Sequence, residues 1–404
     1  MKSRLLLLAT VLVIWTNLFV VALGQGPSGQ VISKPPPVND AAAARAEQAA
    51  RLKRKAAVAD QLELALKDGN NSLSNYLLNR DQSELSKAEA SYKRAGQLQP
   101  SDWRSYAGLG NCYYFAGRYS DSEEALKRAA ILGPRQSQIY SLLARTYSNE
   151  LSSMPETATA QRQQKLDQQL AAREKAVAVD PSAKNYQAFN DLAEAYAYRN
   201  LYDKAIATYK REATLFPVSE KQKIADIHYR IGIFYQDSKR PLDAIAEFQE
   251  AIRLIPDSDF YYLLLASAAR DAKLYKESIA AYQHANSLKP ERETELEIAQ
   301  VYAEAGDYEQ ATSIANRAIK DRPQDWQGYA TLGFIYWQAK QYDKSLEPLE
   351  QAIRLKSDVP GLHYYRGLSK LMLGHKDEAN QEYEILKKTD SPFAQRLLVE
   401  INKN

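Results

Sequence analysis

The chain has 404 residues, of which 45% are apolar and 25% are charged, a composition typical of a globular protein with a long core. Its 53 basic and 50 acidic residues give a net charge of +3, and this near balance argues against a nucleic-acid binder, which would carry a basic stripe. Cys112 is the only cysteine, so an intrachain disulfide and a cysteine-based zinc site are excluded.

Residues 1–24 are typical of a secretory signal peptide or of an N-terminal membrane anchor. Lys2 and Arg4 precede Leu5–Leu23, a stretch without charge whose 19 residues would rise roughly 28 Å as a helix, close to a bilayer core. The small residues around Leu23 also suit a cleavage site, so both interpretations stay open. In either case the basic residues remain in the cytoplasm, and the rest of the chain is predicted to be exported, periplasmic or membrane-anchored.

Residues 25–39 are rich in proline and glycine and predict an extended linker. A charged, alanine-rich helix is expected over residues 40–68, with Asp40 as its N-cap and a stop before Gly69. This helix carries a basic cluster, Arg51, Lys53, Arg54 and Lys55. Contact with anionic lipid headgroups would suit that cluster, but a solvated helix face balanced by nearby acidic residues is the favoured interpretation.

The stretch Trp103–Gln136 defines a unit that the chain repeats. Its first apolar stripe, from Tyr106 to Tyr113, has the spacing of one helix face, and Gly117 then permits the helix to end. A second stripe follows and stops at Pro134. The unit is therefore a helix, a short turn, a second helix and a turn marked by proline.

Closing prolines recur at gaps of 34, 47, 36, 39, 34 and 33 residues, a period that indicates a stacked array. These prolines are Pro100, Pro134, Pro181, Pro217, Pro256, Pro290 and Pro323.

The unit resembles the tetratricopeptide repeat. Leu109-Gly110 matches the Leu-Gly pair of that family, Gly117 the turn glycine, Ala129 the small second-helix position and Pro134 the closing proline. The resemblance covers roughly residues 70–391. It implies an all-α, right-handed superhelical solenoid of about eight helix pairs over residues 103–391, preceded by a degenerate first repeat at 69–102.

Two departures from the regular period are expected. The 47-residue gap predicts an insertion at about residues 148–169, interrupted at Met154-Pro155 and then helical. Residues 392–404 predict an amphipathic helix that caps the last repeat.

No catalytic motif accompanies the repeats. The sequence lacks H-E-x-x-H, a glycine-rich phosphate loop and G-x-S-x-G, and the space outside the repeats is too short for a catalytic domain. His228 and His363 replace an aromatic residue at a packing position, which favours packed histidines over metal ligands. We therefore expect no enzyme, no cofactor, no metal and no nucleic-acid partner.

The resemblance implies a concave groove lined by the first helix of each pair. Exposed aromatic and polar residues there suit an extended or helical peptide, and the most apolar patch is expected at Phe334, Trp337, Tyr364 and Tyr365. The candidate groove residues are Asn111, Tyr114, Arg145, Asp191, Glu194, Arg230, Arg270, Phe334, Trp337, Tyr364 and Tyr365. Tyr364 and Tyr365 have an equally good interpretation as cover for the last core layer.

These observations predict an exported scaffold that binds a protein or peptide partner in the groove, with membrane attachment through residues 5–23 if they are retained. A second interpretation is a structural subunit of an envelope assembly, such as a pilus, secretion, outer-membrane or polysaccharide machine, which docks through its convex face or the insertion. A third is an accessory protein that binds glycans or polysaccharide machinery.

Overall fold

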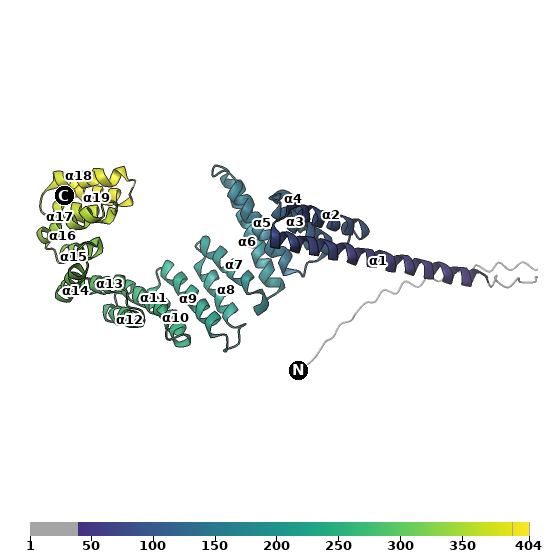
Figure 1. The fold of residues 1–404 in the computed structure, drawn as a ribbon, viewed down its shortest axis with the longest axis horizontal. Coiled ribbons are helices and arrows are strands. Elements are labelled where there is room, and N and C mark those ends of the chain that lie inside the picture. The colour runs from purple at the N-terminus through teal and green to yellow at the C-terminus, as the bar shows by residue number, and fades with distance from the viewer. Residues whose placement is uncertain (1–38, 390, 404) are drawn as a thin grey trace, which may run out of the picture. The chain divides into compact units, whose positions relative to one another are not determined.

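The computed structural model describes residues 39–389 and 391–403. The chain divides into two units, residues 1–60 and residues 61–404. Within the second unit, helices joined by short turns follow one another as pairs from α3 to α18 (Figure 1), and each helix packs on the next along the chain. The predicted all-α solenoid of eight helix pairs, with a degenerate first repeat and a terminal helix, is confirmed.

The nineteen α-helices of the described residues have the following bounds: α1 Asn39–Asn79, α2 Gln82–Leu98, α3 Trp103–Phe115, α4 Tyr119–Leu132, α5 Ser137–Ser153, α6 Thr159–Val179, α7 Tyr186–Tyr198, α8 Tyr202–Ala213, α9 Lys221–Asp237, α10 Pro241–Leu254, α11 Asp259–Asp271, α12 Tyr275–Leu288, α13 Arg292–Glu304, α14 Tyr308–Asp321, α15 Trp326–Gln338, α16 Tyr342–Leu355, α17 Pro360–Met372, α18 Lys376–Lys388 and α19 Pro392–Lys403. A short 3-10 turn, Ala183–Asn185, precedes α7.

The turn inside most pairs repeats one backbone motif. After α3, Gly117 takes a positive φ of 73°, and the Arg118 N–H donates to the Tyr113 carbonyl at 2.9 Å. This bond back over five residues is the Schellman ending of a helix. The left-handed position of the other such turns is held by Asn200, Lys239, Lys273, Gly306, Lys340 and Gly374. The sequence signal of a turn glycine is therefore present in only part of the array.

The core lies between consecutive helices, where a small residue of the first helix receives a large residue of the second. A Cβ added at Gly110 would lie 2.6 Å from Leu126, and one added at Gly232 would lie 2.4 Å from the Phe248 ring. Leu126 and Phe248 are fully buried. This close approach explains the glycine of the Leu-Gly pair at these positions, because even the methyl group of alanine would press on the large residue of the second helix.

Helix α1 departs from the sequence prediction. It begins at Asn39 rather than after an Asp40 cap, and it continues through Gly69 to Asn79. Gly69 does not end the helix because its role is close packing: a Cβ there would lie 2.8 Å from the buried Tyr92 ring. The degenerate first repeat therefore shares its first helix with the alanine-rich helix before it.

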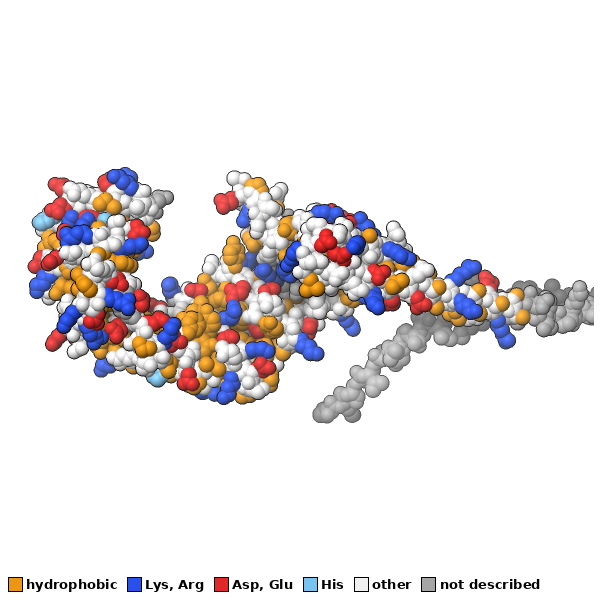
Figure 2. Space-filling model, viewed as in Figure 1, with side chains coloured by type: hydrophobic (Ala, Val, Ile, Leu, Met, Phe, Trp, Pro, Cys, Tyr) orange, Lys and Arg blue, Asp and Glu red, His pale blue; other side chains and the backbone are white. Residues whose placement is uncertain are grey.

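The part of α1 in the first unit is exposed, since every residue from 42 to 60 has an exposed side chain. Lysine and arginine side chains follow one another along this surface (Figure 2). The basic cluster Arg51, Lys53, Arg54 and Lys55 therefore lies on an exposed part of α1, as both of its interpretations require.

Two elements depart from the regular helix pairs, the lengthened pair α5–α6 and the terminal helix α19. The insertion lengthens one pair: α5 has 17 residues and α6 has 21, joined by the loop of residues 154–158. Helix α19 packs on α17 and α18, and it buries Leu397 and Ile401 against them.

No helix of the described residues is both long and apolar enough to cross a membrane. The signal or anchor prediction for residues 5–23 lies outside the described residues.

Candidate functional site

The first helices of some neighbouring pairs contact one another: α3 contacts α5, α13 contacts α15 and α15 contacts α17. We call the side of the array that these helices present the first-helix face. Two hollows open between them. The N-terminal hollow, of about 720 Å³, lies among α1, α3 and α5, and the C-terminal hollow, of about 490 Å³, lies among α11, α13, α15 and α17.

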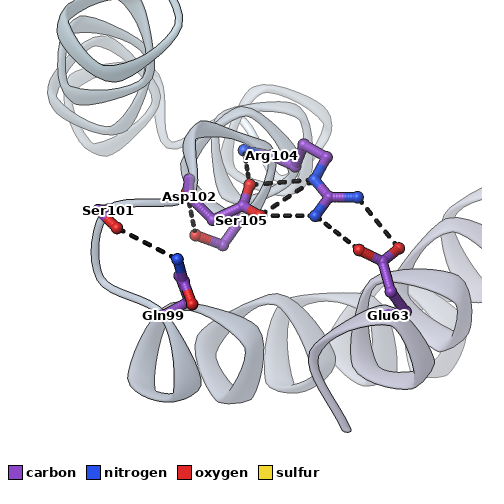
Figure 3. Close-up of polar contacts among 6 residues, drawn as sticks. All are labelled: Glu63, Gln99, Ser101, Asp102, Arg104 and Ser105. Atoms are coloured by element: carbon purple, nitrogen blue, oxygen red, sulfur yellow. Dashed lines mark hydrogen bonds and ion pairs between the residues drawn. The ribbon is translucent and has the colours of Figure 1, made fainter. Parts of the chain in front are cut away.

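Arg104 organises one wall of the N-terminal hollow (Figure 3). Its guanidinium donates to Glu63 of α1 at 2.7 and 3.0 Å and to Asp102 at 2.6 Å. Asp102 also caps α3 by accepting the Arg104 backbone N–H at 2.8 Å. Burial opposes ionisation of Asp102, but the hydrogen bonds from Arg104 hold the pKa of this carboxyl below its ordinary value. The network therefore fixes α1 against α3.

The three N-terminal groove candidates have different settings. Asn111 lines the N-terminal hollow, and its amide donates to the Ala107 carbonyl of its own helix at 3.0 Å. Tyr114 and Arg145 lie together outside that lining, with the guanidinium 5.0 Å from the ring centre. That distance suits a cation–π contact between α3 and α5.

In the middle of the array two of the three candidates, Glu194 and Arg230, form a linked group. Arg230 of α9 contacts Glu194 of α7 at 3.1 Å, and the Tyr209 hydroxyl donates to the same carboxylate at 3.1 Å. Asp191 is separate from them, since it accepts from Gln187 of its own helix at 2.9 Å. Arg230 and Glu194 are therefore already paired with one another.

Arg270 stands at the edge of the C-terminal hollow and reaches across to α13. Its guanidinium donates to Glu304 at 2.6 and 2.9 Å and to Glu297 at 2.8 Å. The hydrogen bond with Glu304 raises the pKa of Arg270, although burial opposes this. The group thus remains charged in a half-buried site.

The four candidate aromatic residues cluster, but only two of them line the C-terminal hollow. Phe334 and Tyr365 do so, with ring centres 5.3 Å apart and nearly perpendicular planes. Trp337 is not part of that lining; its ring centre lies 5.0 Å from that of Tyr365, and its indole nitrogen is buried without a hydrogen-bond partner among the described residues. Tyr364 packs on Phe393 of α19 at 5.0 Å. Of the four candidate aromatic residues, Phe334 and Tyr365 are therefore the two that a partner bound in this hollow could contact; Trp326 also lines it.

Sequence reasoning missed a buried carboxylate in the third pair. Glu212 of α8 occupies the small second-helix position that is alanine in seven other pairs: Ala95, Ala129, Ala176, Ala251, Ala285, Ala318 and Ala352. Its side chain is 2% exposed, and its Oε2 has no hydrogen-bond partner among the described residues. Burial raises the pKa of Glu212 to about 7, against a weaker opposing effect of Arg230. Comparison of the repeats position by position would have identified it.

A second buried carboxylate fixes the last pair. Glu382 accepts from His363 at 2.9 Å, contacts Arg366 at 2.8 Å and contacts Lys370 at 3.2 Å. Burial opposes ionisation, but these partners hold the pKa of Glu382 below its ordinary value. His363 is buried at the position predicted to be a packing site, and a related pair, His228 and Glu247, recurs at 2.7 Å in the fourth repeat. In the described part of the chain no group of histidine, cysteine or acidic residues could hold a metal ion.

Comparison with known families gives three matches to sequence models described as tetratricopeptide repeat, at residues 80–146, 225–291 and 296–360. The human protein O-mannosyl-transferase TMTC1 is 32% identical over 87 residues, which cover 21% of this chain and 10% of that protein. The BBSome complex member BBS4 homolog of Drosophila melanogaster is 21% identical over 297 residues, covering 72% of this chain and 59% of that protein. The chain thus spans less than two thirds of either relative.

Among solved structures, a tetratricopeptide repeat protein from Parabacteroides merdae is similar, with 16% identity, a TM-score of 0.42, and coverage of 75% of this chain and 99% of that one. Yeast Tom70 has 14% identity and a TM-score of 0.36 over 84% of this chain and 88% of its own. The repeated helix pairs, their shared packing positions and the three sequence matches identify the chain as a member of the tetratricopeptide-repeat family.

Proposed function

We propose that this chain is a scaffold that binds a protein or peptide partner on its first-helix face, with the C-terminal hollow as the main anchoring site. Tetratricopeptide repeats serve protein–protein interaction, and stacked repeats create extended binding surfaces of this kind. The observation that carries the proposal is the juxtaposition of Phe334 and Tyr365 with the half-buried charge of Arg270 in one hollow. Aromatic groups beside a buried charged group are typical of interface hot spots.

The test is capture of partners by the full chain used as bait. Phe334→Ala should reduce capture by roughly tenfold, as expected for an aromatic anchor, while the helical circular dichroism signal stays unchanged. Leu242→Ala is a matched control, because Leu242 is 66% exposed on a second helix, away from the first-helix face. Equal loss of capture in both variants, or in neither, would refute the assignment of the binding surface.

We also propose that the repeats work outside the cytoplasm, as a periplasmic protein or one held at the membrane by residues 5–23. Support comes from the sequence alone, where Lys2 and Arg4 precede an uncharged stretch of bilayer length. Mass spectrometry of the protein from its native cells would decide the form: a start near Gln25 means release, and an intact N-terminus means an anchor. Recovery of the intact chain in the cytosolic fraction would rule out export.

The alternative is a structural subunit of an envelope assembly that docks through the insertion. Its support is the long α5–α6 pair, whose connecting loop exposes Pro155, Glu156 and Thr157. Lys165 does not belong to that contact surface, because it is held by Glu123 at 2.9 Å and Glu150 at 2.7 Å. Replacement of residues 155–157 by Gly-Ser-Gly would remove co-purified partners under this alternative and would leave them bound under the groove proposal.

A further inference from the structure

Another hollow, of about 350 Å³, lies among α5, α6 and α7, and we call it the insertion hollow because the lengthened pair α5–α6 supplies most of its lining. Four lining residues come from α6 at spacings of four, three and four residues, which places them along one helix face. They are Arg162, Leu166, Gln169 and Arg173. The neighbouring first helices contribute Ser148, Leu151, Ser152, Glu194, Ala195 and Tyr198.

Arg173 has a partly buried guanidinium group without a counter-charge. It donates one hydrogen bond to the neutral side-chain oxygen of Gln169 at 3.2 Å, and it forms no ion pair with any of the described residues. Burial lowers the pKa of Arg173, and the carboxylate of Asp191, which lies beyond ion-pair distance, only partly opposes this. Arg270 and Arg366 are also partly buried, but each contacts a glutamate, at 2.6 and 2.8 Å. A desolvated cation without such a partner favours binding of an anion.

The other charged groups of the insertion hollow are already compensated. Glu194, the one acidic residue of the lining, contacts Arg230 at 3.1 Å and accepts a hydrogen bond from the Tyr209 hydroxyl at 3.1 Å. Arg162 donates to two carbonyls at the C-terminal end of α5, both at 2.8 Å, and the negative end of that helix offsets part of its charge. The charge that remains in the hollow is therefore that of Arg173.

The rest of the lining indicates which anion fits. Leu151, Leu166 and Ala195 supply apolar surface, and Tyr198, whose side chain is 77% exposed, leaves its ring available to a ligand. A guanidinium group presents parallel N–H donors that match the two oxygens of a carboxylate. A phosphate dianion fits less well, because its second charge would be desolvated beside aliphatic side chains without a second free cation. The hollow thus suits a carboxylate that is accompanied by apolar groups.

We propose that the insertion hollow binds an acidic segment of a protein partner, in which a glutamate or aspartate carboxylate contacts Arg173 and a neighbouring apolar side chain packs on Leu166 and Tyr198. Glu194 lines this hollow and also contacts Arg230 of the next first helix, α9, so a partner that extends along the first helices reaches it. This site goes beyond the proposed function, because it shares no lining residue with the C-terminal hollow. It also differs from docking through residues 155–157, none of which lines it.

The test measures binding of three blocked, fluorescently labelled heptapeptides to the full chain by fluorescence anisotropy. The probes are Ser-Gly-Leu-Glu-Leu-Gly-Ser, the same peptide with glutamine in place of glutamate, and the same peptide with phosphoserine at that position. The variants are Arg173→Gln and Arg173→Lys. Arg94→Gln is the matched control, because it makes the same charge change at an exposed arginine of α2 that forms no ion pair with the described residues. Melting curves check that each variant folds.

The wild type and Arg94→Gln are expected to bind the glutamate peptide roughly tenfold or more tightly than the glutamine peptide, as a charged hydrogen bond requires. Arg173→Gln should bind both peptides alike. Arg173→Lys should keep part of the preference, because lysine retains the charge but not the paired donors. The melting temperature of Arg173→Gln should be unchanged or higher, since the substitution removes a desolvated cation that has no counter-charge.

A wild type without a preference for the glutamate peptide, or a preference that persists in Arg173→Gln, would overturn the proposal. Tightest binding of the phosphoserine peptide, lost in Arg173→Gln, would reject the carboxylate and assign the hollow to phosphorylated segments instead. A marked fall in the melting temperature of Arg173→Gln would show that Arg173 has a structural role rather than a free charge. Phe334→Ala should leave the preference unchanged, so failure of the C-terminal hollow as an anchoring site is distinguished from failure of this one.

Discussion

The ring of Tyr92 lies directly on the backbone of Gly108, so closely that a Cβ at Gly108 would stand 2.3 Å from a ring carbon. Gly69 contacts the same ring, with a corresponding distance of 2.8 Å. The Tyr92 hydroxyl also donates to Asn70 at 2.7 Å, and the residue is 2% exposed. Tyr92 of α2 therefore joins α1 to α3.

Gly108→Ala should destabilise the chain. The methyl group would overlap the Tyr92 ring, and such overpacking costs about 1–3 kcal/mol, more than the roughly 1 kcal/mol gained from the helix propensity of alanine. Chemical unfolding followed by circular dichroism measures the change. Gly361→Ala is the control, since nothing lies within 4 Å of its added Cβ, and it should leave stability unchanged or slightly higher.

Lys340→Gly should stabilise the turn between α15 and α16. Lys340 has a φ of 58°, a left-handed conformation that glycine adopts without a steric cost. We expect a gain of about 0.5–1 kcal/mol, because relief of that cost exceeds the added flexibility of the unfolded chain. Gly306 has a φ of 85° at the matching turn, so Gly306→Lys should lower the urea midpoint. Equal midpoints for all three proteins would show that the turn conformation has no energetic role.

Glu382→Gln should loosen the last helix pair. The substitution removes the charge that His363, Arg366 and Lys370 share, and it leaves cations in a largely buried site. Removing one member of a buried ionic group typically costs about 3–5 kcal/mol. Hydrogen exchange over α17 and α18 should accelerate, whereas Glu384→Gln, at a surface pair 3.6 Å from Lys387, should change nothing measurable. Unchanged protection in Glu382→Gln would mean that the cluster does not hold this end of the array.

Glu212 makes the free energy of unfolding depend on pH, because its raised pKa stabilises the folded chain more at low pH than at high pH. Its pKa rises from an ordinary 4.5 to about 7 on folding, so the folded chain binds the extra proton between those values. The contribution is complete below pH 4.5, and it is lost as the pH rises through about 7. Glu212→Ala restores the alanine found in seven other pairs. We expect the change in the free energy of unfolding caused by this substitution to be more favourable at pH 8 than at pH 4.5, by up to about 3 kcal/mol.

Urea midpoints of the wild type and Glu212→Ala across pH 4.5 to 8 measure that difference directly. Glu220→Gln, which alters an exposed pair with Lys223, provides the control for general charge effects. A difference between wild type and Glu212→Ala that stays constant across this range would show that Glu212 does not titrate on folding.

The repeat period and its packing positions were predictable from sequence, because each helix pair satisfies the same local spacing independently of the others. Gly69 was misread, since glycine both ends helices and permits close contact, and only the position of Tyr92 distinguishes these roles. Turns with Lys239, Lys273 and Lys340 carry no glycine signal, and their geometry is imposed by the packed helices on either side.

The candidate site was predictable only at the level of the helix face. The repeat pattern places Phe334, Trp337, Tyr364 and Tyr365 on neighbouring first helices, but it cannot say that the Trp337 ring contacts Tyr365 or that Tyr364 packs on Phe393. The pairing of Arg270 with Glu297 and Glu304 crosses between helices, 27 and 34 residues apart, and depends on how the pairs stack. The charge pairing at the C-terminal hollow is therefore a tertiary property.

Site-specific photo-crosslinking tests the central claim, that partners bind the first-helix face, most directly. A photoreactive phenylalanine analogue is placed at Phe334 in one full-chain protein and at Ile131, 72% exposed on a second helix, in another. Irradiation in native cells followed by mass spectrometry should yield partner adducts from position 334 and none from position 131. Adducts from position 131 together with none from position 334 would contradict the account and would move the binding surface to the second helices.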